Sequence, residues 1–304
     1  MKQIFGYIRE FLEEVNIKVL GVVSLFTGLF IFINYYFRVD DRVSDLHFHE
    51  RFIYRYIIFL LAFAFPYLLY RLIADRKYSA HPLFLLLLFL SPAIFALKSS
   101  LNFPIHFTND YTWNNYWNHV FYWPFLLVLL MCILFVIWKI TERGRSFYGM
   151  TGKQMNWRPY FMMLLIMLPL VALASTQPDF LAMYPKLKVI TRVFYAADIT
   201  WWHKLIFELS YGSDFIGIEL FFRGFLVLAF IKWAGKDAIL PMACFYCTIH
   251  FGKPLGECIS SFFGGAILGI ISYHTRSIWG GLMVHLGIAW LMELGGYIGN
   301  AINR

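Results

Sequence analysis

The sequence predicts an all-α protein, a polytopic transmembrane helical bundle of eight or nine helices. Hydrophobic residues make up 60% of the 304 residues and charged residues only 14%, whereas a soluble domain carries about 25% charged residues. Long apolar runs recur along the whole chain, and a run of about 20 such residues is enough to cross a bilayer. Both observations indicate an integral, multi-pass membrane protein.

The expected helices follow the apolar runs in order. Residues 1–16 alternate apolar and charged side chains at helical spacing, which is typical of a helix that lies in the membrane interface. The membrane spans are expected at 17–37, 52–73, 82–97, 121–140, 159–175, 212–231, 238–252, 258–273 and 277–297. The run 238–252 is short enough to be partly re-entrant.

The basic residues predict the orientation of the chain. They lie between apolar runs, for example at Arg71, Arg76, Lys232 and Lys236, whereas the connection 99–120 has no Lys or Arg. Cytoplasmic loops of membrane proteins are enriched in these residues, so the basic loops and the N-terminus are expected in the cytoplasm. This pattern explains the net charge of +8. The expected partner is therefore the lipid bilayer, and no nucleic acid.

Four ionisable residues interrupt the later apolar runs: Glu219, Arg223, His250 and His285. Such a side chain at membrane depth costs about 2.5–3.5 kcal/mol on insertion scales, so it is normally paired or kept for a function. Glu219 and Arg223 are four residues apart in the order that favours an ion pair on one helix face. A purely structural pair and a functional pair are about equally expected from these two residues alone.

The polar residues stand in three motifs that resemble one family. The stretch Ile218-Glu219-Leu220-Phe221-Phe222-Arg223-Gly224 resembles the first motif, Glu-Glu-x-x-x-Arg, of the CAAX prenyl protease and bacteriocin-processing (CPBP) family of intramembrane metalloproteases. Tyr246-Cys-Thr-Ile-His250 stands for Phe-x-x-x-His, and His285-Leu-Gly-Ile-Ala289 for His-x-x-x-Asn. The resemblance implies a CPBP-like catalytic core over 159–304, preceded by N-terminal transmembrane helices over 1–158, within one integral membrane unit.

Two positions depart from the family pattern. The first Glu of the family motif, which is assigned with the His to activating water, is Ile218 here. The Asn that helps to hold the oxyanion is Ala289. Asp214 lies one turn before Ile218 on the same helix face and could supply the missing carboxylate.

The resemblance implies an intramembrane endopeptidase that cleaves a membrane-anchored protein or peptide. Glu219 or Asp214 would be the base, with His250 as its partner or a metal ligand and His285 as the oxyanion donor or a metal ligand. Glu219, His250 and His285 could also bind a divalent metal such as zinc, with an open fourth position. Two alternatives remain open. Ile218 and Ala289 favour an inactive family member that binds membrane proteins, and buried ionisable residues also occur in small transporters.

Overall fold

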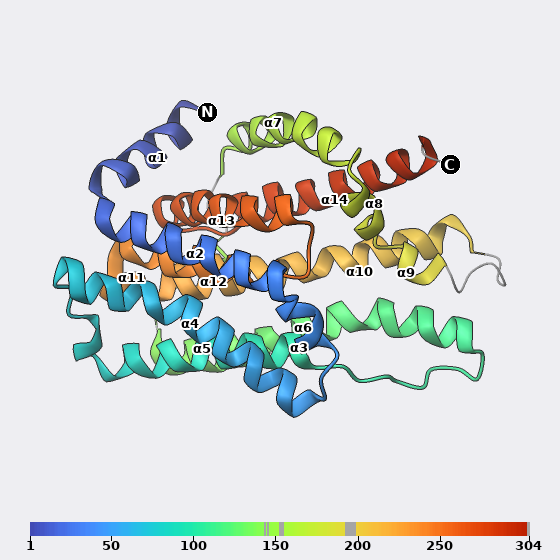
Figure 1. Cartoon of the computed structure of the whole chain (residues 1–304), viewed down its shortest axis with the longest axis horizontal. Helices are drawn as coiled ribbons and strands as arrows, with labels where there is room; N and C mark the ends of the chain where they lie inside the picture. Colours follow the sequence, from blue (N-terminus) through green and yellow to red (C-terminus); the bar gives the residue numbers. More distant parts are fainter. Residues whose placement is uncertain (143, 145, 152–154, 192–198, 303–304) are drawn as a thin grey trace. The chain divides into compact units, whose positions relative to one another are not determined.

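The computed structural model of the chain describes residues 1–142, 144, 146–151, 155–191 and 199–302. Within these ranges every regular element is a helix (Figure 1), which confirms the all-α class. Six of these helices are long and apolar enough to cross a membrane, so the protein is an integral multi-pass membrane protein. The expected total of eight or nine helices stays a prediction, as does the cytoplasmic N-terminus.

Two compact units make up the chain, and their segments alternate along the sequence. Unit 1 comprises Met1–Asn102, Glu142–Thr151 and Leu220–Ile278, and unit 2 comprises Phe103–Thr141, Gly152–Glu219 and Trp279–Arg304. The predicted division separates two continuous segments, 1–158 and 159–304, whereas each compact unit contains three separate segments. The predicted division into N-terminal helices and a catalytic core stays a prediction.

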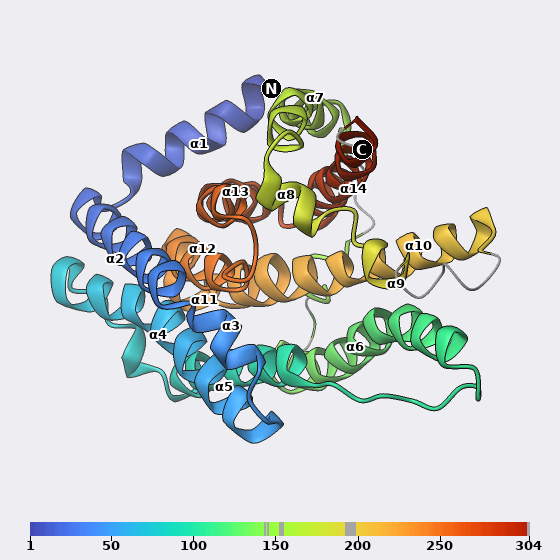
Figure 2. The same cartoon turned by 45° about the vertical axis from the view of Figure 1, so that its right-hand side comes forward.

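Unit 1 is built around one buried helix, α12. Its helices are α1 (Lys2–Glu14), α2 (Ile17–Phe37), α3 (Val39–Ser44), α4 (Phe48–Ala74), η1 (Tyr78–Ala80), α5 (Pro82–Ser100), the π-helix η3 (Leu220–Ala229), α11 (Ile231–Ala234), η4 (Gly235–Ala238), α12 (Ile239–Thr248) and α13 (Leu255–Thr275). Helices α2, α4, α13 and η3 pack against α12, and Figure 2 shows α13 beside it.

The short helix α12 is apolar on every side because it is surrounded by other helices. All ten of its residues are buried. Its residue Phe245 contacts aromatic rings from three other helices: Phe59 on α4, Phe95 on α5 and Phe222 on η3. Ten residues span about 15 Å, about half of the hydrocarbon thickness of a bilayer. The core of unit 1 therefore fixes the end of α12, where His250 follows.

Unit 2 centres on two long helices, α10 (Trp201–Glu219) and α14 (Trp279–Ile302), which pack against each other. Helix α6 (Tyr111–Thr141) covers α10, and α7 (Arg158–Ala174) covers α14. Two short helices, α8 (Pro178–Met183) and α9 (Lys188–Thr191), complete the unit. Glu219 ends α10, and His285 lies within α14.

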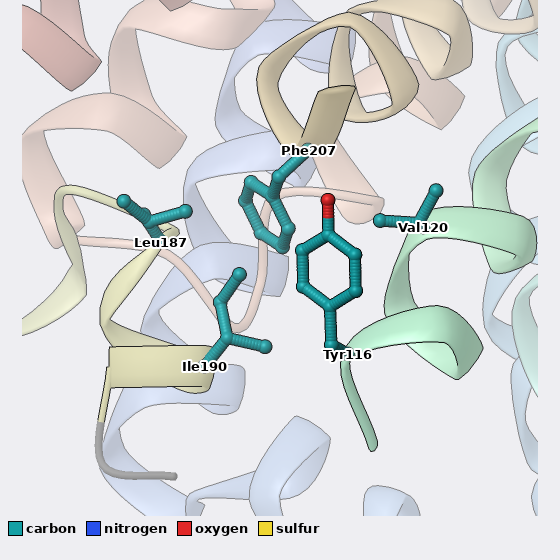
Figure 3. Packing of buried hydrophobic residues seen from close by; sticks show 5 residues of the cluster. All are labelled: Tyr116, Val120, Leu187, Ile190 and Phe207. Atoms are coloured by element: carbon teal, nitrogen blue, oxygen red, sulfur yellow. The ribbon is translucent and has the colours of Figure 1, made fainter. Parts of the chain in front are cut away.

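A cluster of buried side chains joins α6, α9 and α10 (Figure 3). Tyr116 stands at its centre, and its hydroxyl donates a hydrogen bond to the carbonyl of His203 at 2.8 Å. Figure 3 shows the ring of Tyr116 between Phe207, Ile190 and Val120. The phenol thus fills apolar space and also satisfies a backbone carbonyl, and this contact fixes α10 against α6.

Candidate active site

The central contact of unit 2 joins Glu219 to His285. Nδ1 of His285 lies 2.8 Å from Oε1 of Glu219. The Glu219 side chain is fully buried, and 13% of the His285 side chain is exposed. Because a carboxylate only accepts hydrogen bonds, Nδ1 carries the hydrogen and donates it. The neutral imidazole then holds its lone pair on Nε2, the nitrogen that can take a proton or bind a ligand.

Helix α10 supports this pair with its preceding turn. Phe215 meets the His285 ring edge to face, with ring centroids 4.8 Å apart. Gly212, one turn earlier, lets α14 approach closely: a Cβ at this position would lie 3.3 Å from a side-chain carbon of Leu286. The imidazole is thus held at its Nδ1 by a carboxylate and on its face by an apolar ring. Sequence reasoning missed Phe215, although its position one turn before Glu219 places it beside that residue.

The residues that depart from the family pattern have contrasting surroundings. Ala289, one turn after His285, is 4% exposed and packs with Tyr211, Phe215 and Leu282 in an apolar cluster. Ile218 and Asp214 are half-buried on α10. Asp214 precedes Glu219 by five residues, which turns it by about 140° around the helix. Asp214 therefore shares the face of Ile218 and not that of Glu219.

In unit 1 the motif residues Arg223 and Tyr246 stack on each other. The guanidinium carbon of Arg223 lies 4.1 Å from the centre of the Tyr246 ring. Arg223 is fully buried and Tyr246 is 4% exposed. A desolvated cation over an aromatic face is stabilised by about 2 kcal/mol. The sequence did not predict this contact, because the two residues lie on different helices.

His250 also contacts the tyrosine, with its ring edge to face against that of Tyr246. Its ring centroid lies 4.7 Å from that of Tyr246, and its Nδ1 lies 3.0 Å from the Tyr246 carbonyl oxygen. A carbonyl oxygen only accepts, so Nδ1 of His250 donates and Nε2 holds the lone pair of the neutral ring. Both motif histidines therefore have the same tautomer, fixed by a carboxylate for His285 and by a backbone carbonyl for His250.

A change of helix type separates Glu219 from Arg223. Helix α10 ends at Glu219, and residues Leu220–Ala229 form a π-helix. A π-helix closes i→i+5 hydrogen bonds, so the α-helical spacing behind the predicted Glu219–Arg223 ion pair does not continue past Glu219. The apolar run gave no sign of this change. The ion pair itself stays a prediction, and so does a shared site for Glu219, His250 and His285.

The described residues offer few donor groups for the predicted metal. In the part of the chain that the structure describes, no group of three His, Cys, Asp or Glu side chains is placed to hold a metal ion. Hydrolytic zinc sites have three protein ligands. Metal-binding histidines do usually donate their second ring nitrogen to a carboxylate or a backbone carbonyl, as both histidines do here. The metal stays a prediction.

Residues 201–291 match the family model described as Type II CAAX prenyl endopeptidase Rce1-like. The match includes all three motif segments and confirms the resemblance to the CAAX protease family over that region. No curated protein and no solved structure gives a significant match.

Proposed function

We propose that the protein is an intramembrane endopeptidase that hydrolyses a peptide bond in a membrane-anchored protein or peptide. The observation that carries the proposal is the hydrogen bond between His285 and the fully buried Glu219. Burying an unpaired polar group is costly, and a carboxylate–imidazole pair is a common arrangement for general base chemistry. The family match to 201–291 supports the same reaction class.

The chemistry proposed for this pair is proton transfer. Nε2 of His285 removes a proton from the attacking water as it adds to the scissile carbonyl, and the proton later passes to the leaving amine. Glu219 accepts the Nδ1 hydrogen throughout, which keeps Nε2 as the base and stabilises the imidazolium that forms. Asp214 and His250 remain candidates for further roles, Asp214 as a second base and His250 as a second imidazole that presents Nε2.

A divalent metal, if bound by the histidines, would polarise the scissile carbonyl and lower the pKa of a bound water. Each histidine would offer Nε2 to such an ion, since Nδ1 of His285 is hydrogen-bonded to Glu219 and Nδ1 of His250 to the Tyr246 carbonyl. Glu219 would then orient a ligand rather than bind the ion itself.

The test is cleavage of membrane-anchored peptides by the purified protein in lipid vesicles. Glu219→Gln loses the negative charge, and its amide can donate to Nδ1 and so favour the tautomer without a lone pair on Nε2. On the proposed mechanism kcat should therefore fall by up to about 10⁴-fold, as it does for the corresponding Asp→Asn change in the Ser-His-Asp triad. His285→Gln should abolish cleavage. His119→Gln removes another half-buried imidazole of unit 2, from α6, and serves as the matched control. Equal rates for His285→Gln and His119→Gln would refute the proposal.

One observation favours a second function, a catalytically inactive scaffold that binds membrane proteins. Ala289 occupies the position of the oxyanion-holding Asn, and it is buried among apolar side chains. A scaffold would retain membrane peptides without cleaving them, and Ile218→Glu alone would switch cleavage on. Crosslinking of the parent protein to peptides that it does not cut would identify this function.

A further inference from the structure

The loop after His250 is held by residues from the opposite end of the sequence. It connects α12 to α13 over residues 249–254, and its own backbone bonds include the Lys253 amide donating to the His250 carbonyl at 3.0 Å. Backbone bonds of this kind join residues close in sequence, including residues at the end of α12. Two side chains of α2, Asn34 and Tyr35, connect the loop to that helix.

Asn34 binds the loop with one end of its amide and the chain after α2 with the other. Nδ2 donates to the Phe251 carbonyl at 2.9 Å, and Oδ1 accepts the Asp40 amide hydrogen at 3.0 Å. The residue is 3% exposed. With both ends of the amide engaged, its orientation is determined, and the donor points at the loop.

Tyr35 makes the second connection. Its hydroxyl donates to the Lys253 carbonyl at 2.6 Å. The Lys253 amide in turn binds the His250 carbonyl, so Tyr35 is one backbone hydrogen bond from the histidine. Phe30, on the same helix, places its ring 6.3 Å from that of Phe251. Helix α2 thus contacts the loop through two hydrogen bonds and one ring.

The backbone around α3 allows this contact. Arg38 has a φ of 51° and ends α2 in the left-handed conformation, which turns the chain back and starts α3. Asp40 then lies against Gly252: a Cβ on this glycine would be 2.6 Å from Oδ2 of Asp40. A side chain at this position would force the Asp40 carboxylate to move.

We propose that Asn34 and Tyr35 are positioning residues for His250. They hold the backbone of the loop that carries the histidine, although they lie far outside the family-matched region 201–291. The inference rests on the proposed peptidase function. It gives the N-terminal helix α2 the task of holding the loop of His250 in place for that reaction. It gives a role to a part of the chain that the family motifs do not cover.

The experiment compares Tyr35→Phe with Tyr36→Phe. Both remove one hydroxyl from α2, but Tyr36 is 69% exposed and serves as the matched control. We expect Tyr35→Phe to lower kcat by about tenfold, the lower end of the loss seen for supporting residues, with KM little changed. Amide hydrogen exchange over residues 249–256 should become faster in Tyr35→Phe and stay at the parental rate in Tyr36→Phe.

Two further variants keep the outcome decisive. Asn34→Ala should show the same loss of kcat and the same faster exchange. Gly252→Ala should displace the loop from the other side, through contact with Asp40, and repeat the pattern. A variant with lower thermal stability but with parental kcat and exchange over 249–256 would show a purely structural role and overturn the inference. If the parent protein cleaves nothing but the Tyr35 and Asn34 variants still exchange faster than the parent over 249–256, the proposed function is refuted. The role of these residues in positioning the loop then stands.

Discussion

The stack of Arg223 on Tyr246 gives a quantitative prediction for unit 1. The guanidinium carbon lies 4.1 Å from the ring centre, and the two residues are 0% and 4% exposed. Replacing Arg223 by Met removes the charge but keeps much of the apolar volume, and Tyr246→Leu removes the ring. Combining the two changes in a double-mutant cycle isolates the energy of the stack from the losses that each change causes alone.

The expected coupling free energy is about 1–2 kcal/mol, because both partners are desolvated and cation–π pairs reach about 2 kcal/mol under such conditions. Each single variant should lose more than this, since Arg223→Met removes one buried cation together with all of its contacts. Tyr246→Phe keeps the ring and should show most of the coupling of the parent protein. Arg223→Lys keeps the charge but not the planar group, so it should retain only part of the coupling free energy with Tyr246.

The assay is reversible unfolding of the four proteins of the cycle in mixed micelles, followed by circular dichroism. When two sites do not interact, the stability loss of the double variant equals the sum of the two single losses within about 0.3–0.5 kcal/mol. A coupling energy below that limit would refute the stack as a stabilising contact. An Arg223→Met curve that overlays the parent would also refute the expected loss of stability in that single variant.

The other predictions concern unit 1 and the predicted metal. Burial raises the pKa of Asp237 in η4 above its ordinary value, despite its hydrogen bond from Tyr78 and the nearby Arg76. A raised carboxyl pKa contributes stability below the unfolded pKa, which is lost as pH rises through the folded pKa, so the melting temperature of Asp237→Asn relative to the parent should increase from about pH 4 upward. Metal analysis checks the ion predicted at Glu219, His250 and His285: a parent protein without metal refutes it, and its loss from His250→Ala supports it.

Much of the fold could be predicted from the sequence, since apolar composition and run length determine membrane helices. The ends of helices were harder to place. The span expected at 121–140 belongs to a helix that begins at Tyr111. Asn and aromatic residues lower the hydropathy of this first part, yet Oδ1 of Asp110 accepts the Trp113 amide at 3.0 Å and caps the helix. Hydropathy does not detect a polar helical turn of this kind.

The candidate site was predictable in its residues but not in its contacts. Motif spacing identified Glu219, His250 and His285. The hydrogen bond between Glu219 and His285 joins residues 66 positions apart, and no local pattern predicts such a pairing. The π-helix after Glu219 has the same apolar composition as an α-helix. The sequence shows Tyr246 only as a substitute for Phe, whereas its ring contacts both Arg223 and His250.

The contact between Asn34 and Phe251 also bears on the synthesis of the protein. These residues are separated by 217 positions. At about 5–20 residues per second, roughly 10–40 s pass between the emergence of the two from the ribosome. During that time α2 is already in the membrane, but its asparagine lacks the carbonyl that it will bind. The His250 loop can therefore take its final position only after Phe251 has been made, so the site proposed around this histidine would stay unformed while the intervening helices are inserted.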